Sequence, residues 1–237
     1  MKARSFAITD IGMKRKVNQD AFLKDDDLGI FLVADGMGGH RGGEVASQLA
    51  VQIIRDFCVE HRSLPASERI NQAINAACEQ IFLKAAQNED LHGMGTTILA
   101  LLIENGEASL GQVGDSRGYL MSEGKIWQIT EDHSLLNEEL RSGRLAASQA
   151  KDYQFKNVIT RSVGYESRVA VDVYRRVLRS GDIFLLCTDG LSGLVSIEEI
   201  EKELSKNNMQ QGLQNLIDLA NSRGGDDNIT ALACEVK

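Results

Sequence analysis

The stretch FLVADGMGGHRGGE, residues 31–44, decides how the rest of the chain is interpreted. An apolar run ends in Asp35, and glycines fill the turn that follows. An Asp-Gly pair often closes a β-hairpin, but a hairpin needs a second strand. Here apolar residues follow at helical spacing instead, from Val45 to Phe57. No Lys-Ser or Lys-Thr pair follows the glycines, so a P-loop is disfavoured. The stretch predicts a buried strand, a tight turn and a helix.

The order of elements around this stretch predicts the fold class. Apolar alternation and turn residues predict strands at 6–9, 21–23, 30–34, 96–103, 108–113, 118–121, 126–130, 169–177, 183–187 and 229–236. Helical periodicity predicts helices through 45–57, 70–85, 197–204 and 213–220. Ser67 is expected to cap the second of these helices. Blocks of strands between paired helices disfavour a parallel doubly wound sheet. We expect an α+β fold, a four-layer α-β-β-α sandwich of two mainly antiparallel sheets flanked by helix pairs.

Composition limits the classes of protein that the chain can be. Its 237 residues fit one domain, expected over 1–237. The net charge of −8 argues against a nucleic-acid binder. The four cysteines form no CxxC pair, which favours free thiols in a reducing compartment. No apolar run reaches the roughly 18 residues of a membrane span. The start of the chain has no apolar signal-peptide core. We expect a cytoplasmic monomer that uses neither membrane nor nucleic acid.

Five aspartates lie at the ends of apolar runs or in tight polar turns, and they carry the chemistry. They are Asp20, Asp35, Asp115, Asp189 and Asp227. Two carboxylates about 4 Å apart repel by roughly 4 kcal/mol at an effective dielectric near 20, so a cluster requires cations. Ligands that are all oxygen indicate Mg²⁺ or Mn²⁺. Asp115, in a Gly-Asp-Ser turn, and Asp20 could equally be ordinary turn residues.

Two further residues could act on a phosphate. Arg15 lies in a basic turn before Asp20, and its guanidinium could bind phosphate through two hydrogen bonds or simply be solvated. His40 lies in the glycine-rich turn and could donate a proton to a leaving group or be a surface residue. His133 is expected to cap or order the segment after it. No Ser/His/Asp arrangement is readable from the sequence, which argues against a nucleophile-elbow hydrolase.

Taken in order, these motifs resemble the metal-dependent protein phosphatases of type 2C, particularly their compact bacterial members. The resemblance spans Thr9 to Val236. The matching pieces are TDIGMKRKVNQD, VADGMGGHRGGEVAS, GMGTT, VGDSRGYL, ITEDHSL, NVITRSVG, GDIFLLCTDGL and GGDDNIT. The resemblance implies a central β-sandwich flanked by helix pairs. It also implies hydrolysis of phosphoserine and phosphothreonine in proteins, by a hydroxide bridging two metal ions.

The resemblance also assigns roles to residues. Asp35 would bridge both Mg²⁺ or Mn²⁺ ions, and the carbonyl of Gly36 would complete one site. Asp189 and Asp227 would hold the other ion, and Asp20 would stand nearby through a metal-bound water. The third ion of some bacterial relatives would use Asp115 with Asp189. Arg15 would grip the phosphate, and residues 134–157 would form a flap beside the site.

The sequence departs from the family pattern in places, and other functions remain open. Gln19 stands where many relatives have Glu, and Met37 stands where some place a His, which leaves His40 or a metal-bound water as proton donor. The stretch DYQFKN differs from the usual flap sequence. The expected partners are phosphorylated Ser/Thr proteins and an opposing Ser/Thr kinase. The alternatives are a phosphoprotein-binding module with little turnover and a metal-dependent hydrolase of small phosphate esters.

Overall fold

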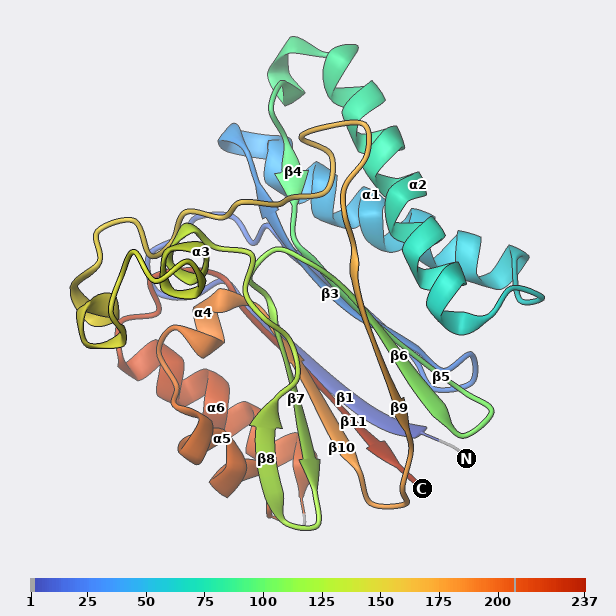
Figure 1. Ribbon diagram of the computed structural model, residues 1–237, viewed down its shortest axis with the longest axis vertical. Helices are drawn as coiled ribbons and strands as arrows, with labels where there is room; N and C mark the ends of the chain where they lie inside the picture. Colours follow the sequence, from blue (N-terminus) through green and yellow to red (C-terminus); the bar gives the residue numbers. More distant parts are fainter. Residues whose placement is uncertain (1–2, 207) are drawn as a thin grey trace.

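The computed structural model describes residues 3–206 and 208–237, with the side chains of residues 39–41 and 151 also outside the described part (Figure 1). The strands are β1 (Ala3–Asp10), β2 (Asp20–Asp25), β3 (Ile30–Met37), β4 (Gly95–Thr96), β5 (Ile98–Glu104), β6 (Glu107–Val113), β7 (Arg117–Ser122), β8 (Lys125–Gln128), β9 (Asp172–Val177), β10 (Ile183–Cys187) and β11 (Ile229–Val236). The α-helices are α1 (Gly39–Glu60), α2 (Ala66–Ala86), α3 (Leu135–Arg141), α4 (Asp189–Ser192), α5 (Ile197–Leu204) and α6 (Met209–Ser222). Short 3₁₀ turns cover Glu89–Leu91 and Ala147–Asp152.

The strands form two antiparallel sheets. One has the order β1-β11-β10-β7-β8, and the other has β2-β3-β5-β6-β9 with β4 added beside β3. The central strands are apolar at nearly every position because both faces of each sheet are covered. β3 and β10 therefore appear in the sequence as continuous apolar runs rather than as alternating ones.

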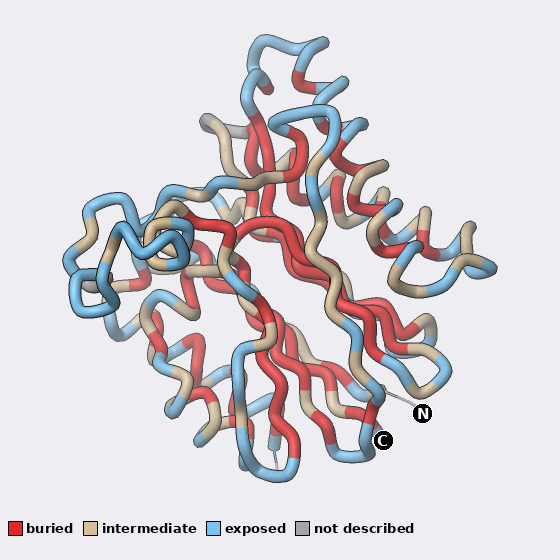
Figure 2. The backbone as a smooth tube through the Cα atoms, viewed as in Figure 1, coloured by how far each residue is buried: buried red, intermediate tan, exposed pale blue. Residues whose placement is uncertain are grey.

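The two sheets pack face to face, with a helix pair on each outer face (Figure 1). One apolar cluster lies between the sheets and includes Phe31, Leu101 and Phe184. A second lies under α1 and α2, and a third lies under α5 and α6. Figure 2 shows buried residues concentrated in the strands, while the segment around α3 is mostly exposed. The expected α-β-β-α sandwich is confirmed.

Several boundaries differ from the prediction. The helix α2 begins at Ala66, because the carbonyl of Pro65 accepts hydrogen bonds from the N–H groups of Glu68 and Arg69; Ser67 is not its cap. The strand expected over 96–103 is interrupted at Thr97. The strand expected from 169 begins only at Asp172, because the N–H of Val169 binds the side chain of Asn75 on α2.

None of the helices formed by residues 3–206 and 208–237 combines the length and apolar character needed to cross a bilayer.

Candidate metal centre

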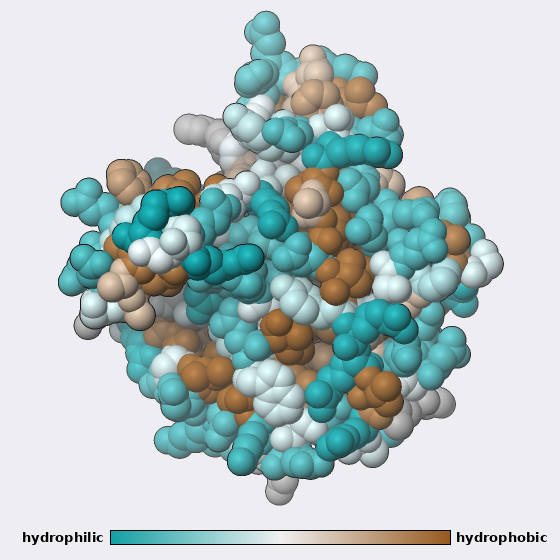
Figure 3. Space-filling view, in the orientation of Figure 1, coloured by the Kyte–Doolittle hydropathy of each residue, from teal (hydrophilic) through white to brown (hydrophobic). Residues whose placement is uncertain are grey.

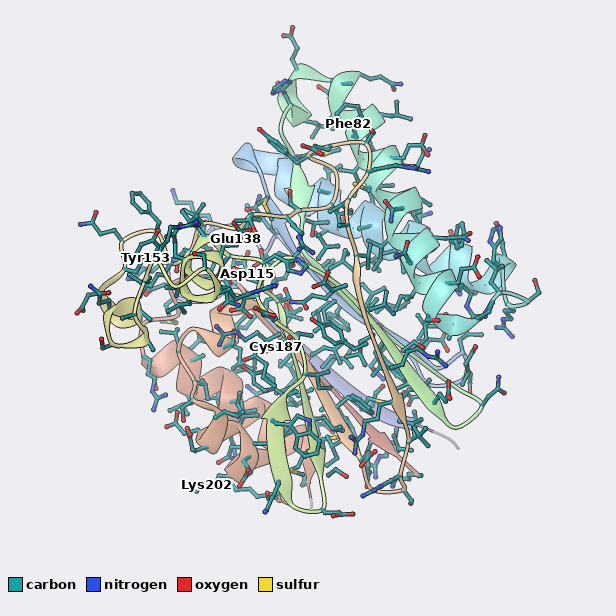
Figure 4. The ribbon with its side chains drawn as sticks, in the orientation of Figure 1. Phe82, Asp115, Glu138, Tyr153, Cys187 and Lys202 are labelled. Carbon is teal, nitrogen blue, oxygen red and sulfur yellow. The ribbon has the colours of Figure 1, made fainter. Side chains whose placement is uncertain are left out.

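The aspartates singled out in the sequence come together where ends of the two sheets meet. β3 ends beyond Asp35, and α4 begins at Asp189 directly after Thr188, which follows β10. Asp115 lies in the turn between β6 and β7 (Figure 4) and Asp227 just before β11. A cavity of about 340 Å³ opens between them, and its lining includes Arg15, Asp35, Gly36, Asp115, Asp189 and Asp227. One cavity therefore collects residues that are up to 212 positions apart in the sequence.

Asp20 stands behind this cavity and is almost fully buried. It pairs with Asp35 in the β2–β3 register. One carboxylate oxygen accepts hydrogen bonds from the hydroxyls of Thr188 at 2.9 Å and Thr230 at 2.6 Å, while the other has no partner among the described residues. Burial raises the pKa of Asp20 to about 7, although both hydroxyl hydrogen bonds oppose this shift and Asp189 adds to it. A buried carboxylate with a free oxygen can accept a further donor, such as a water.

The carboxylates that line the cavity disfavour one another's charge. Burial, then the negative charges of Asp20 and Asp189, hold the pKa of Asp35 well above its usual range. The pKa of Asp189 is raised by burial and by Asp227, and its Oδ1 has no partner among the described residues. Burial and Asp189 raise the pKa of Asp115 to about 7. Such mutual repulsion in a cavity is typical of a site completed by a bound cation.

Buried hydroxyls hold the aspartate-bearing turns in place. The Oγ1 of Thr97 accepts the N–H of Asp35 at 3.0 Å and lies 2.8 Å from the Oγ of Ser116, beside Asp115. The Oγ1 of Thr188 accepts the N–H of Thr230 at 2.9 Å. Ser116 and Thr188 stand directly beside the candidate ligands Asp115 and Asp189 in the sequence, but nothing local marks Thr97 and Thr230 as their partners.

The backbone at Gly36 is packed too closely for any side chain. A Cβ on Gly36 would come within 2.0 Å of the carbonyl oxygen of Gly43 and 2.6 Å of that of Gln19. The N–H of Gly36 also donates to the carbonyl of Gln19 at 3.2 Å. Glycine is therefore required here because the end of β3 approaches the backbones of Gly43 in α1 and of Gln19 just before β2.

The basic turn between β1 and β2 lies at the rim of the cavity. The Nη2 of Arg15 is 2.6 Å from Oδ2 of Asp227, and Lys14 pairs with Asp226. Arg15 is half exposed, and it lines the cavity with the aspartates. It is thus the guanidinium placed to meet an anion that enters there. The side chain of His40 lies outside the described residues, and Met37 is the residue that lines the cavity directly after Gly36.

His133 connects the Asp115 turn to the segment expected to be a flap. The N–H of Gly114 donates to its Nδ1 at 3.1 Å, so Nε2 carries the proton and donates to Asp172 at 3.1 Å. The carbonyl of His133 accepts the N–H of Thr160. His133 thus fixes the start of this segment against Gly114, Thr160 and Asp172, while Ser134 supplies the cap of α3.

The donor set fits a hard divalent cation. It offers carboxylate oxygens and a backbone carbonyl, which suits Mg²⁺ or Mn²⁺. Among the described side chains, no three acidic, His or Cys groups already converge into a finished metal shell. The carboxylates raise one another's pKa values, and Arg15 pairs with Asp227. A bound cation would relieve the repulsion among the carboxylates and would compete with Arg15 for Asp227.

The comparison with known families decides the identity. The sequence profile described as Protein phosphatase 2C matches residues 13–232. The chain belongs to the protein phosphatase 2C family. It is 40% identical over 235 residues to the serine/threonine phosphatase stp of Listeria welshimeri, an alignment that covers 96% of this chain and 93% of that protein.

Solved structures of phosphatase 2C proteins have the same fold as this chain. The serine/threonine phosphatase PstP/Ppp of Mycobacterium tuberculosis superposes with a TM-score of 0.94 at 32% identity, with all of both chains covered. The catalytic domain of PstP in complex with two manganese ions gives a TM-score of 0.90 at 33% identity, covering 100% of this chain and 99% of that one. The family resemblance drawn from the motifs is confirmed.

Proposed function

We propose that this phosphatase 2C chain removes phosphate from phosphoserine and phosphothreonine in proteins with the help of Mg²⁺ or Mn²⁺. The observation that carries the proposal is the single cavity that gathers Arg15, Asp35, Gly36, Asp115, Asp189 and Asp227. A mere phosphoprotein-binding module would have no need for so many repelling carboxylates. The sequence offers no element that would recognise a nucleotide base. Both alternatives are therefore disfavoured.

The proposed metal ligands are those that the family resemblance assigns, and their positions in the lining of one cavity support them. Asp35 would touch two ions, with the Gly36 carbonyl completing one site and Asp189 with Asp227 holding the other. PstP, which shares this fold, has been solved with two manganese ions, and this supports a two-ion site here. We further propose that Asp115 could recruit a third ion. When bound, the ions supply positive charge for the phosphoryl oxygens and Lewis acidity for the attacking water.

The protein's own groups would divide the remaining work. Arg15 would exchange its contact with Asp227 for the phosphoryl oxygens, where a guanidinium can donate two parallel hydrogen bonds. The free oxygen of Asp20 would orient water at the back of the site. His40 is proposed as one source of the proton for the leaving serine or threonine oxygen. These contributions matter because phosphate monoesters can require accelerations of up to about 10²¹.

The remaining expectations stand as proposals. We propose one catalytic domain over residues 1–237, a flap at 134–157, a monomeric state, a cytoplasmic location and an opposing Ser/Thr kinase. The exposed side chains along 134–157, and the way His133 joins this segment to the Asp115 turn, support the flap.

The decisive test is turnover with and without a key ligand. The metal-replete protein should hydrolyse a phosphothreonine peptide and nitrophenyl phosphate when Mn²⁺ is added, and should stop when the metal is chelated. Asp189→Asn should lose most of this activity, because it removes a charged oxygen from the cavity. The matched control is Asp218→Asn, the same change on the exposed face of α6. Full activity in Asp189→Asn would refute the proposed site.

A further inference from the structure

A second groove adjoins the metal cavity and shares part of its wall. It encloses about 650 Å³, and Met37 and Ile159 line both spaces. One wall is built from residues 159–170, which follow the proposed flap, and Gly93 also lines the groove. Anything bound at the metal centre through a phosphate can therefore extend directly into this groove.

The backbone of this wall is held firmly against the fold. Val163 and Thr96 exchange two backbone hydrogen bonds of 2.9 and 3.0 Å. The N–H of Gly164 donates to Sγ of Cys78 on α2 at 3.3 Å, and that thiol donates to the carbonyl of Glu166 at 3.1 Å. Gly164 has a φ of +98°, and a Cβ there would strike Ile81 at 2.1 Å. The wall is thus a rigid platform, which lowers the ordering cost of binding.

The side chains on this platform point to what it binds. Tyr165 is 69% exposed, a large aromatic surface beside the site. Arg168 is exposed and forms no salt bridge with any described residue. Arg161, in contrast, donates to Asp172 at 2.8 Å and is already neutralised. Arg168 is therefore a free cation at the groove, although Glu166 also contributes a carboxylate there.

The surroundings make an acidic polypeptide the best occupant. Tyrosine and arginine are enriched where proteins bind one another, because they combine apolar area with hydrogen bonding. Apolar groups from Met37, Ile159 and Val169 share the groove with Thr160 and Ser162. Figure 3 shows apolar groups interspersed with hydrophilic ones on this face of the molecule. In a chain of net charge −8, a free arginine beside the site offers local attraction to an acidic segment.

We propose that this groove binds the polypeptide next to the phosphorylated residue, and that Arg168, with Tyr165 beside it, selects an acidic side chain there. The inference rests on the proposed phosphatase function and gives it a substrate preference. Arg168 contacts the flanking chain and takes no part in the chemistry. It should therefore change KM for peptides and leave small phosphate esters unaffected.

The test uses the full chain with Mn²⁺ and a set of phosphothreonine peptides. In each peptide one glutamate, glutamine or lysine is placed at one position on either side of the phosphothreonine. At one or more positions glutamate should lower KM about fivefold relative to glutamine, the scale of an exposed ion pair. Nitrophenyl phosphate, which has no flanking chain, reports the metal centre alone. Inactivity on every substrate would contradict the proposed function, whereas turnover with equal KM for all peptides would overturn only the groove.

Charge reversal provides the sharper test. Arg168→Glu should abolish the glutamate preference and favour lysine, while kcat/KM on nitrophenyl phosphate stays unchanged. The matched control is Lys202→Glu on α5, far from Asp115 in Figure 4, which changes the net charge equally. An equal shift of peptide preference in Lys202→Glu would overturn the proposal. Tyr165→Ala should raise KM for all peptides alike. The wild-type peptide preference tests the proposal even if Arg168→Glu fails to fold, which circular dichroism would show.

Discussion

The two ends of β3 treat buried charge in opposite ways. At the start of the strand, near Ile30, the buried guanidinium of Arg69 donates to the carboxylate of Glu104 and to the carbonyl of Arg62. At the other end, Asp35 faces further carboxylates that raise its pKa. A charge that the protein neutralises itself serves the fold. A buried charge without a protein partner destabilises the fold until a ligand such as a cation binds to it.

The largest effect should come from removing charge at the Asp35 end. Asp35→Asn should lower kcat on nitrophenyl phosphate by roughly 10³-fold, the scale seen when one preorganised electrostatic group is lost. The same variant, stripped of metal, should melt at a higher temperature than the wild type, because one repelling carboxylate is gone. Calorimetry with chelator measures this. A metal-free variant that is less stable than the wild type would mean that Asp35 serves the fold rather than a ligand.

At the Ile30 end of β3, removing a charge should lower stability and leave activity unchanged. Glu104→Gln leaves Arg69 buried without its counter-charge and should cost about 3 kcal/mol of unfolding free energy, the low end for a broken buried pair, because Glu104 is partly exposed. Activity on nitrophenyl phosphate should not change. Glu107→Gln, which breaks the exposed pair with Arg175, is the control and should cost less than about 1 kcal/mol. Equal losses of unfolding free energy in Glu104→Gln and Glu107→Gln, measured by urea denaturation, would show that the buried Arg69–Glu104 pair has no special role in the fold.

The pH dependence of the metal-free protein should sharpen the comparison next. The folded-state pKa of Asp20 is about 7, against about 3.9 in the unfolded chain. Between these values the native state holds more protons than the unfolded state, so stability falls as pH rises. From pH 5 to 7.5 this group should cost on the order of 2 kcal/mol.

Comparison with Asp20→Asn isolates this effect from other titrating groups. The variant should show a shallower fall of unfolding free energy with pH, measured by urea denaturation in the presence of chelator. Saturating Mn²⁺ should also flatten the wild-type curve, because the bound ion favours the ionised carboxylates. Identical slopes for wild type and variant would show that the Asp20 carboxyl is not held protonated in the native state.

The sequence was most informative where one local pattern implied one geometry. An apolar run followed by Asp-Gly and a non-strand segment predicted both Asp35 and Asp189 at strand ends, and the helix pairs followed from their periodicity. Asp115 and Asp20 could not be separated from ordinary turn residues by such local reasoning. Their place in the site depends on which turns meet in space, and the order of the motifs indicated this only through the family resemblance.

Contacts between distant segments account for what the sequence did not predict. The hydroxyls of Thr97 and Ser116 hydrogen-bond to each other, and the N–H of Thr230 donates to the hydroxyl of Thr188. Both contacts join segments that are far apart in the chain, and no local signal predicts these pairings. The same holds for the late start of β9, where Asn75 on α2 takes the hydrogen bond of Val169. Ser67 had the right chemistry for a cap, but Pro65 already supplied the carbonyl that begins α2.

The smallest effect on stability should come from an exposed ion pair that lies outside the buried parts of both ends of β3. Lys14 and Asp226 form an ion pair in which both side chains are mostly exposed. Water and salt screen such a pair, and holding two long side chains in place costs entropy, so Lys14→Ala should change unfolding free energy by less than about 0.5 kcal/mol.

Arg15, the neighbour of Lys14, lines the cavity, so Arg15→Ala should lose turnover while its stability also changes little. Measuring kcat and thermal stability for both variants compares adjacent cations of one turn. A loss of turnover in Lys14→Ala as large as that in Arg15→Ala would show that the whole basic turn, rather than its one inward guanidinium, acts on the phosphate.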